Sequence, residues 1–121
     1  MPAYRIAQLD EIPALDCPCG QTRRAFGDLG ESPASVHLVK IRKDARTHYH
    51  KYQTEIYVIL EGVGQIELDG MLFPVKPLTA IKIPPGCRHR ALGEMTVINL
   101  VTPSFDANDE WFDDPAKKDA P

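Results

Sequence analysis

Long apolar segments are missing from this 121-residue chain. The longest uninterrupted apolar stretch runs from Ile56 to Leu60, whereas a helix that spans a bilayer needs roughly 20 such residues. The amino-terminal residues mix polar and apolar side chains and contain no apolar core of a secretory signal. We therefore expect no membrane partner and a cytoplasmic location.

A concentrated basic surface is also missing. The chain has 14 basic and 17 acidic residues and a formal charge of −3 at pH 7, and no run of Lys or Arg is longer than two. Proteins that bind nucleic acids usually carry a basic face, because phosphate contacts supply much of the affinity. The charge pattern therefore excludes nucleic acid as the main partner.

Cysteine is scarce, and the three residues present are an odd number. In a chain without an export signal this indicates free thiols in a reducing compartment. The sequence Cys17-Pro18-Cys19 is either half of a thiolate metal site or a simple turn. Cys87 alone cannot complete a four-thiolate site, which favours the turn, and a redox role for the pair stays open.

Aromatic residues make up only 7% of the chain, while 11 prolines are scattered along it. Because proline interrupts helices, we expect short elements within one domain. Short apolar runs separated by Gly, Pro and Asp are typical of strands, and they occur at 35–42, 55–60, 65–68, 71–73, 78–83 and 94–102. Asp69-Gly70 predicts a primed hairpin turn between two of them. The pattern predicts an all-β protein, either a sandwich or a closed barrel.

Three parts are expected along the chain. Residues 1–34 form an N-terminal extension with an edge strand, and residues 35–104 form the barrel. Residues 105–121 form a C-terminal tail that is acidic and aromatic, with Phe105, Trp111 and Phe112 among several aspartates. For this tail we favour a solvated segment with a hydrophobic anchor over a ligand site.

Three of the four histidines lie near another candidate ligand. His48 and His50 share one face of an extended segment, because residues two apart point the same way. Glu55 opens the next strand after a short turn, and His89 stands where a strand restarts after a Pro-Gly turn. A buried imidazole needs partners for both nitrogens, and a metal ion satisfies one of them.

Taken together, these side chains offer three imidazole nitrogens and one carboxylate. The absence of thiolates disfavours a structural zinc site, and the mixed set suits Fe(II), Mn(II), Ni(II), Co(II) or Zn(II). Four protein ligands on an octahedral ion leave two positions for substrate, water or dioxygen, as in catalytic sites.

The same residues carry a resemblance to a family. His48-Tyr49-His50 through Glu55 to Gly62 is similar to the first motif of the cupins, and residues 84–89 (Pro-Pro-Gly-Cys-Arg-His) resemble the second. The resemblance covers roughly residues 36–102. It implies a small single-domain cupin, a double-stranded β-helix (jelly-roll) barrel. One divalent metal ion, with Fe(II) or Mn(II) favoured, would be held by His48, His50, Glu55 and His89.

Three positions depart from the family pattern. Arg42 and Leu78 stand where glycine is usual, and Gly93 stands where asparagine is usual. All three are expected at turns or barrel edges, so none of them removes a metal ligand.

Other residues are assigned from their place beside these ligands. Tyr57 shares the facing of Glu55 and is the candidate catalytic side chain. His37 lies alone on a strand and is expected at a surface or an interface. Four residues close to the ligands in sequence are candidates for substrate binding: Arg46, Gln53, Cys87 and Arg88.

The motifs favour a metal-dependent enzyme that acts on a small molecule, with dioxygenase-type or isomerase and lyase chemistry both open. The alternative is a non-enzymatic module that binds or senses a small ligand. An N-terminal strand near Tyr4–Ile6, together with open strand edges, predicts a homodimer in which this segment pairs across the interface.

Overall fold

The computed structural model describes residues 4–27, 33–42 and 44–113. Within these residues it contains nine strands and one short 3-10 helix, and no helix in them is long and apolar enough to cross a membrane. The elements are η1 (Leu9–Glu11), β1 (Leu15–Cys17), β2 (Gly20–Ala25), β3 (Ser35–Ile41), β4 (Thr54–Gly62), β5 (Gly64–Leu68), β6 (Met71–Val75), β7 (Ala80–Ile83), β8 (His89–Leu92) and β9 (Met95–Thr102).

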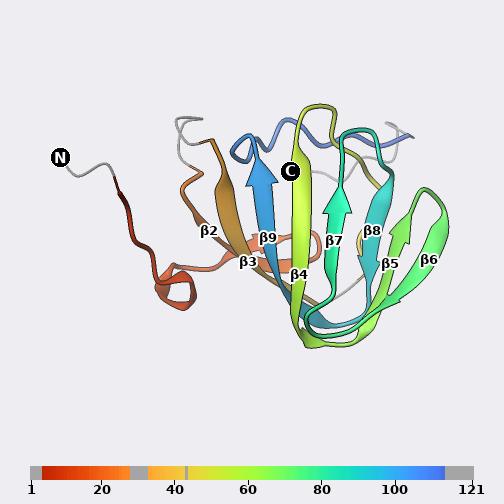
Figure 1. Ribbon diagram of the computed structural model, residues 1–121, viewed down its shortest axis with the longest axis horizontal. Coiled ribbons are helices and arrows are strands. Elements are labelled where there is room, and N and C mark those ends of the chain that lie inside the picture. Colours follow the sequence, from red (N-terminus) through yellow and green to blue (C-terminus); the bar gives the residue numbers. More distant parts are fainter. Residues whose placement is uncertain (1–3, 28–32, 43, 114–121) are drawn as a thin grey trace.

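Every strand pairs antiparallel with its neighbours, in two sheets. The larger sheet has the order β1-β2-β3-β9-β4-β7, and the smaller has the order β6-β5-β8 (Figure 1). Buried residues of β3, β4, β7 and β9 join those of β5, β6 and β8 in one hydrophobic cluster, so the sheets face each other. The all-β prediction is confirmed.

Alternation of side chains builds this core. In β3 and β9 every second residue is buried, as expected for strands with one face against a core. Val39, Ile59, Ile66 and Val97 are the centre of the cluster. Burying such residues stabilises the fold by roughly 1.5–3 kcal/mol each relative to full exposure.

In two of the turns between strands, a residue other than glycine has a positive φ. Asp69 and Gly70 have φ of 48° and 84° and join β5 to β6, so the predicted primed turn is confirmed. Leu78 also has a positive φ, 74°. Its side chain is 82% exposed. The family pattern has glycine at this position, and glycine adopts this conformation without steric cost.

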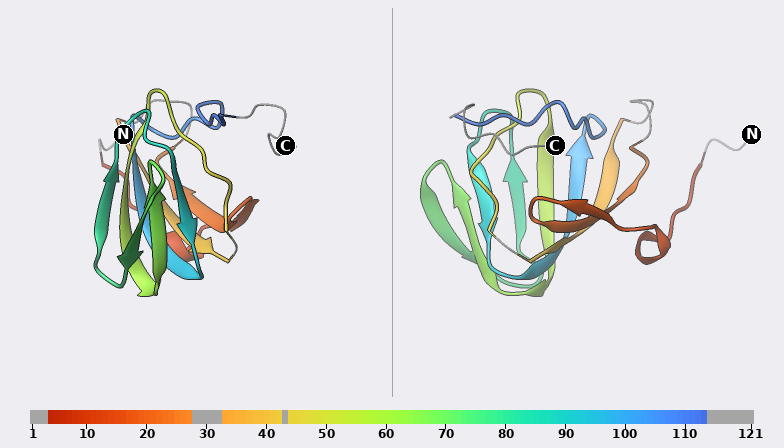
Figure 2. Two further views of the ribbon diagram at one scale, coloured as in Figure 1. Left: turned by 90° about the vertical axis from the view of Figure 1, so that its right-hand side faces the viewer. Right: turned by 180° about the vertical axis from the view of Figure 1, so that it is seen from behind.

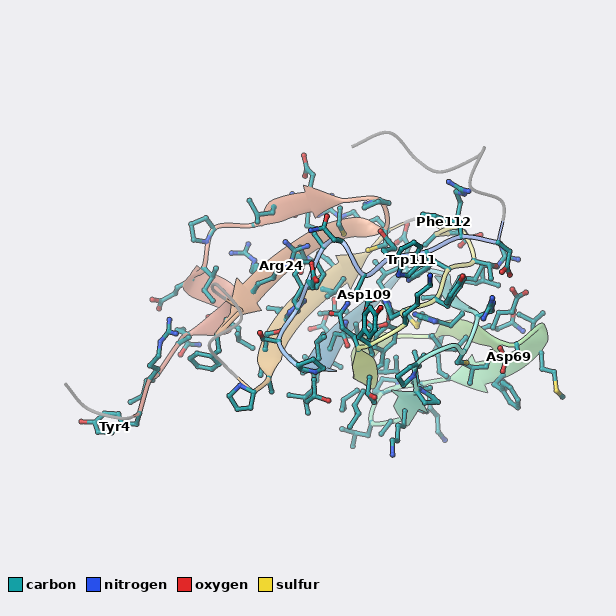
Figure 3. The ribbon with its side chains drawn as sticks, turned by 90° about the horizontal axis from the view of Figure 1, so that it is seen from above. Tyr4, Arg24, Asp69, Asp109, Trp111 and Phe112 are labelled. Atoms are coloured by element: carbon teal, nitrogen blue, oxygen red, sulfur yellow. The ribbon has the colours of Figure 1, made fainter. Side chains whose placement is uncertain are left out.

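The N-terminal part contributes a hairpin to the larger sheet. β2 pairs along its whole length with β3, and β1 follows as the outer strand; the hairpin lies nearer the viewer in the right-hand view of Figure 2. The segment around Tyr4 instead extends away from the body (Figure 3), and Tyr4 is 73% exposed. The homodimer through this segment and the three-part division of the chain stay predictions.

After β9 the chain crosses the open end of the barrel (Figures 1 and 2). Tyr49 and Trp111 exchange two backbone hydrogen bonds of 3.0 and 2.9 Å, which fastens this segment beside residues 48–50. Residues 114–121 of the predicted tail lie outside the described residues.

Candidate metal centre

Backbone pairing brings two of the predicted ligands together. His48 N–H donates to the His89 carbonyl at 3.1 Å, and His89 N–H donates to the His48 carbonyl at 2.8 Å. The two rings therefore stand on neighbouring extended segments, with centroids 4.3 Å apart. His50 follows two residues later on the same face, and its ring centroid is 5.3 Å from each of the other two.

Glu55 completes the group from the start of β4. One carboxylate oxygen, Oε1, lies 2.9 Å from His50 Nε2 and 3.0 Å from His89 Nε2. The other oxygen accepts a 2.6 Å hydrogen bond from Asn99 Nδ2 on β9. The four side chains offer ligand atoms that all lie within 4.8 Å of one another.

Each imidazole is fixed by a backbone carbonyl behind it. Nδ1 of His48 contacts the carbonyl oxygen of Arg46 at 2.9 Å, and Nδ1 of His89 contacts that of Cys87 at 2.9 Å. Nδ1 of His50 contacts the carbonyl of Asp109 in the same way. Because a carbonyl only accepts hydrogen bonds, each Nδ1 carries the proton and each Nε2 of a neutral ring presents a lone pair.

Burial and the contacts among these side chains determine which of them are charged. Burial disfavours ionisation of Glu55, but the close contacts with the His50 and His89 rings outweigh it and hold the pKa of the carboxyl well below its usual range. Burial likewise opposes a charge on His50, yet the neighbouring Glu55 and the Asp109 carbonyl raise its pKa to about 9. Burial lowers the pKa of His48 to about 4, so that ring is neutral at pH 7.

A divalent ion fits this donor set. His50 Nε2 is buried and makes no hydrogen bond, although Glu55 Oε1 lies 2.9 Å away. In the neutral tautomer both atoms are acceptors, so the contact is favourable only with a positive charge between or on them. Three imidazole nitrogens and a carboxylate are ligands that first-row divalent ions accept. These four residues would hold the ion.

The comparisons with known proteins agree with this geometry. Residues 34–98, more than half of the chain, match the model of the family described as "Cupin domain". The chain belongs to the cupin family. The predicted resemblance and the cupin barrel are thereby confirmed.

Solved structures extend the likeness along the whole barrel. A protein from Planctomyces limnophilus is 49% identical, with a TM-score of 0.84 over 93% of this cupin and 97% of that chain. A variant of Streptomyces PAC13 with uridine is 19% identical, with a TM-score of 0.78 over 97% of this chain and 98% of that one. PAC13 is a nucleoside dehydratase, and at this identity it shows the fold alone.

A curated relative matches over a shorter stretch. Polyketide synthase CurC of Streptomyces cyaneus is 40% identical over 43 residues, 36% of this cupin. The match spans only 28% of that relative's length.

A cavity of about 240 Å³ opens beside the metal group of this cupin. His48, His50 and Glu55 form one wall together with Tyr57. A wider depression of about 480 Å³ lies elsewhere, where β3, β4 and β9 meet. Its described lining contains no histidine or cysteine, whereas three of the four candidate metal ligands line the smaller cavity.

A second part of the cavity wall comes from β2. Thr22 and Arg24 point into it from alternate positions of the strand. Thr22 is 3% exposed, and its hydroxyl has no hydrogen-bond partner in the described residues; neither has the buried Arg24 Nε. The Arg24 guanidinium stacks 4.1 Å from the ring centre of Phe105. The hydrogen-bond donors on this wall, the Thr22 hydroxyl and Arg24 Nε, therefore have no acceptors among the described residues.

His37 also lies on this wall, so its expected surface position is wrong. It is 3% exposed, and its Nε2 lies 2.9 Å from the Ser35 hydroxyl. Burial and the nearby Arg24 lower its pKa to about 4. The His37 ring lines the cavity and packs edge-on against Phe105, with ring centroids 5.2 Å apart, which is why a histidine on an apparently open strand is buried.

Glu110 supplies a carboxylate next to the ligands. It lines the cavity, and its Oε1 lies 3.8 Å from His48 Nε2. The flanking residues hold it in place through the Tyr49–Trp111 backbone pair. The sequence prediction did not include Glu110, because it lies 55 residues beyond Glu55 in a segment without a strand pattern.

Tyr57 is the one predicted catalytic side chain, and it lines the cavity. Burial, with Glu55 nearby, raises the pKa of its hydroxyl well above the usual value. The hydroxyl therefore remains protonated and can act as a donor toward a ligand. Its catalytic role stays a prediction.

The four predicted substrate-binding residues do not line the cavity. Gln53 is buried and bonds to Asp106 and Asp109, and Arg46 stacks on Phe112 at 4.0 Å. Arg88 pairs with Asp113 at 2.8 Å and stacks on Tyr49, while Cys87 packs against the core cluster. Their role in substrate binding stays a prediction, without support from the cavity.

Asp109 shows that the expectation of a solvated tail is wrong for this part of the chain, since it is 3% exposed. Its carboxylate accepts the backbone N–H groups of Lys51, Tyr52 and Gln53 at 2.8–3.0 Å, and the Trp111 indole N–H at 3.0 Å. Its carbonyl orients His50. Figure 3 shows Asp109, Trp111 and Phe112 along the segment that crosses the molecule, with Arg24 to one side.

Proposed function

We propose that this cupin is a divalent-metal-dependent enzyme that transfers a proton on a small anionic substrate, with isomerisation or elimination as the outcome. The observation that carries the proposal is the position of Glu110. A carboxylate that lines the same cavity as the metal ligands, 3.8 Å from one of them, is within reach of a molecule bound there.

The metal group supports the first half of the proposal. His48, His50, Glu55 and His89 would hold the ion, with Fe(II) or Mn(II) favoured and Zn(II), Ni(II) or Co(II) also compatible. When bound, the ion would polarise a carbonyl or hydroxyl oxygen of the substrate as a Lewis acid. Asn99 keeps the second oxygen of Glu55 occupied and so directs the first toward the histidines.

Residues of the chain supply the proton transfer. Glu110 removes or returns a proton at a substrate carbon or oxygen, since a carboxylate in such a position is a general base or, once protonated, an acid. The Tyr57 hydroxyl, which stays protonated, donates a hydrogen bond to the oxygen on which negative charge develops. A dehydratase is known among barrels of this fold, and removal of water is one elimination of this kind.

The β2 wall supports an anionic substrate. Arg24 lines the same cavity as three of the metal ligands, and its buried Nε has no hydrogen-bond partner among the described residues. Burial lowers its pKa, although the neighbouring Cys17 and Cys19 oppose this effect, so the guanidinium is partly desolvated and an anionic group on the substrate would stabilise it. A carboxylate or phosphate on the substrate meets Arg24 and Thr22. The cavity is smaller than typical drug-sized pockets of 300–1,000 Å³, so the substrate is small.

The test is solvent exchange, which needs no knowledge of the product. Protein loaded with Mn(II), Zn(II) or, without oxygen, Fe(II) is incubated in D₂O with a panel of small hydroxy and keto carboxylates. Proton NMR then measures deuterium incorporation beside the carbonyl and the appearance of alkene signals. We expect metal-dependent exchange or elimination for one substrate class.

Glu110→Gln provides the decisive variant and Glu94→Gln, at an exposed position, its matched control. Glu110→Gln is expected to lower turnover by roughly 100-fold or more while metal content stays unchanged. Equal turnover in both variants contradicts the role of Glu110. Iron-dependent oxygen uptake without deuterium exchange would contradict the proposal and indicate a dioxygenase. Saturable ligand binding without any turnover would contradict it and indicate a binding module.

A further inference from the structure

Cys17 and Cys19 form a close pair of thiols in the cavity wall. They flank Pro18 in the turn between β1 and β2, and their sulfur atoms are 2.8 Å apart. Both residues line the cavity, and both are free cysteines. A disulfide bond is about 2.05 Å long, so a shift of less than 1 Å separates this pair from a bond.

The turn holds the two sulfurs in this arrangement. Cys17 is paired with Gly20 across the hairpin, and the Cys19 carbonyl accepts the Arg42 N–H at 2.8 Å. A side chain at Gly20 would meet the Lys40 carbonyl oxygen, 2.1 Å from the position of its Cβ. Glycine at position 20 therefore allows β2 to pair closely with β3. This pairing restricts the Cys-Pro-Cys segment that precedes it.

The two thiols are not equivalent. The hydrogen bond from the Cys19 thiol lowers the pKa of Cys17 to about 6, with Arg24 contributing, although burial opposes it. The same hydrogen bond, together with burial, raises the pKa of Cys19. Near pH 7 the pair therefore consists of a Cys17 thiolate and a Cys19 thiol.

We propose that Cys17 and Cys19 are a redox-active dithiol whose oxidants are small disulfides. The Cys17 thiolate attacks one sulfur of the small disulfide, and the other half leaves as a thiolate. Cys19 then attacks the Cys17 sulfur of the mixed disulfide, its proton passing to solvent, and releases the second half as a thiolate. The two cysteines are oxidised by two electrons, and the small disulfide is reduced to two thiols once its halves take up protons.

Cys87 provides an internal reference for this chemistry. It lies outside the cavity, its sulfur contacts the Arg88 carbonyl at 3.8 Å, and burial raises its pKa. It has no second sulfur beside it among the described residues. It therefore remains reduced under conditions that oxidise the pair.

The experiment titrates the full chain, without oxygen, in mixtures of reduced glutathione and glutathione disulfide. After alkylation with N-ethylmaleimide, intact mass spectrometry counts the remaining thiols. The wild-type protein is expected to pass from three alkylated cysteines to one, with no glutathione attached and with the single label on Cys87. Three labels at the most oxidising mixture, or glutathione on Cys87 as readily as on the pair, overturns the proposal.

Serine variants assign the two roles. In Cys19→Ser the hydroxyl still donates to the Cys17 thiolate but cannot resolve a mixed disulfide, so one glutathione is expected to remain on Cys17. Cys17→Ser is expected to retain two alkylated thiols and no adduct. The reverse pattern contradicts the assignment of roles, and if neither variant folds, the wild-type thiol count still decides. None of these outcomes depends on the proposed enzymatic function.

Discussion

The two walls of the cavity differ in how completely their polar atoms are partnered. On the metal wall, every ring Nδ1 and the outer oxygen of Glu55 has a partner, and only inward-facing ligand atoms remain. On the β2 wall, no described residue provides a hydrogen-bond partner for the Thr22 hydroxyl or for Arg24 Nε. The first wall suits a resident metal ion, and under the proposed function the second wall contacts the substrate.

Removing a ligand from the metal wall is expected to have the largest effect. Replacing both His48 and His50 by alanine leaves at most two ligands, so metal affinity should fall well beyond the roughly 10–100-fold loss typical of outer partners. Elemental analysis of protein purified without chelator measures the content. His37, the one histidine outside the proposed ligand set, gives the control: His37→Gln should keep near-stoichiometric metal. Unchanged metal content in the double variant would contradict the ligand set.

Removing Asp109, which supports the metal wall from behind, is expected to have the second-largest effect. Asp109→Ala deletes the acceptor of three backbone N–H groups and an indole N–H, and it frees the segment whose carbonyl orients His50. We expect roughly 2–3 kcal/mol of lost stability and metal binding weaker by about 10–100-fold. Thermal unfolding and metal titration measure the two effects.

Asp113→Ala is the matched control for this change. Asp113 forms an exposed ion pair with Arg88, and such pairs contribute about 0–1 kcal/mol. Equal effects of the two substitutions would show that Asp109 is an ordinary surface acid.

On the β2 wall, Arg24→Gln is expected to weaken anion binding without loss of metal. A charge-assisted hydrogen bond contributes about 1.5–3 kcal/mol, so calorimetric titration of the zinc-loaded protein with malate should show affinity lower by roughly 10–100-fold. Arg88→Gln should leave this affinity unchanged. Equal affinities in Arg24→Gln and the wild type would mean that this wall does not bind the anion.

The thiols of the β2 wall make a smaller, pH-dependent difference. Because the pKa of Cys17 is lowered to about 6, its thiolate persists at pH 7 and is lost as the pH falls through 6. Alkylation of Cys17 by iodoacetamide should therefore rise to a plateau with a midpoint near pH 6, whereas that of Cys87 should still be rising above pH 8. Coinciding profiles would show that Cys19, Arg24 and the nearby Glu110 leave Cys17 unperturbed.

The smallest expected effect lies outside both walls. Leu78→Gly removes an exposed side chain from a left-handed position, which relieves about 1–2 kcal/mol of steric strain and gives back part of it through chain entropy. We expect a gain of up to about 1 kcal/mol in unfolding by denaturant. The affinities for metal and for anion should stay unchanged. This result would show that the gain in stability is independent of ligand binding at either wall.

The metal wall was largely predictable from the sequence. The spacing of His48, His50 and Glu55 is short, and an extended chain converts it directly into a shared face. The primed turn at Asp69-Gly70 was predictable for a similar reason, since few residues adopt positive φ at two successive positions.

The β2 wall and the outer supports were not predictable in this way. Arg24 faces the cavity because β2 pairs with β3 in the register that sets Arg24 opposite His37, and no local pattern gives that register. Asp109 meets His50 across 59 residues and through a backbone carbonyl. Arg88 illustrates the converse, since it is next to His89 in sequence but on the other face of the chain.

The carbonyl supports behind the three histidines have a consequence for how the protein tolerates substitution. A carbonyl is present whatever the side chain, so the residue types at positions 46 and 87 can change while the same ring nitrogen still faces inward. Substitution of Arg46 or Cys87 is therefore expected to leave the orientation of the rings unchanged. The path of the backbone, rather than the neighbouring side chains, sets the orientation of the rings.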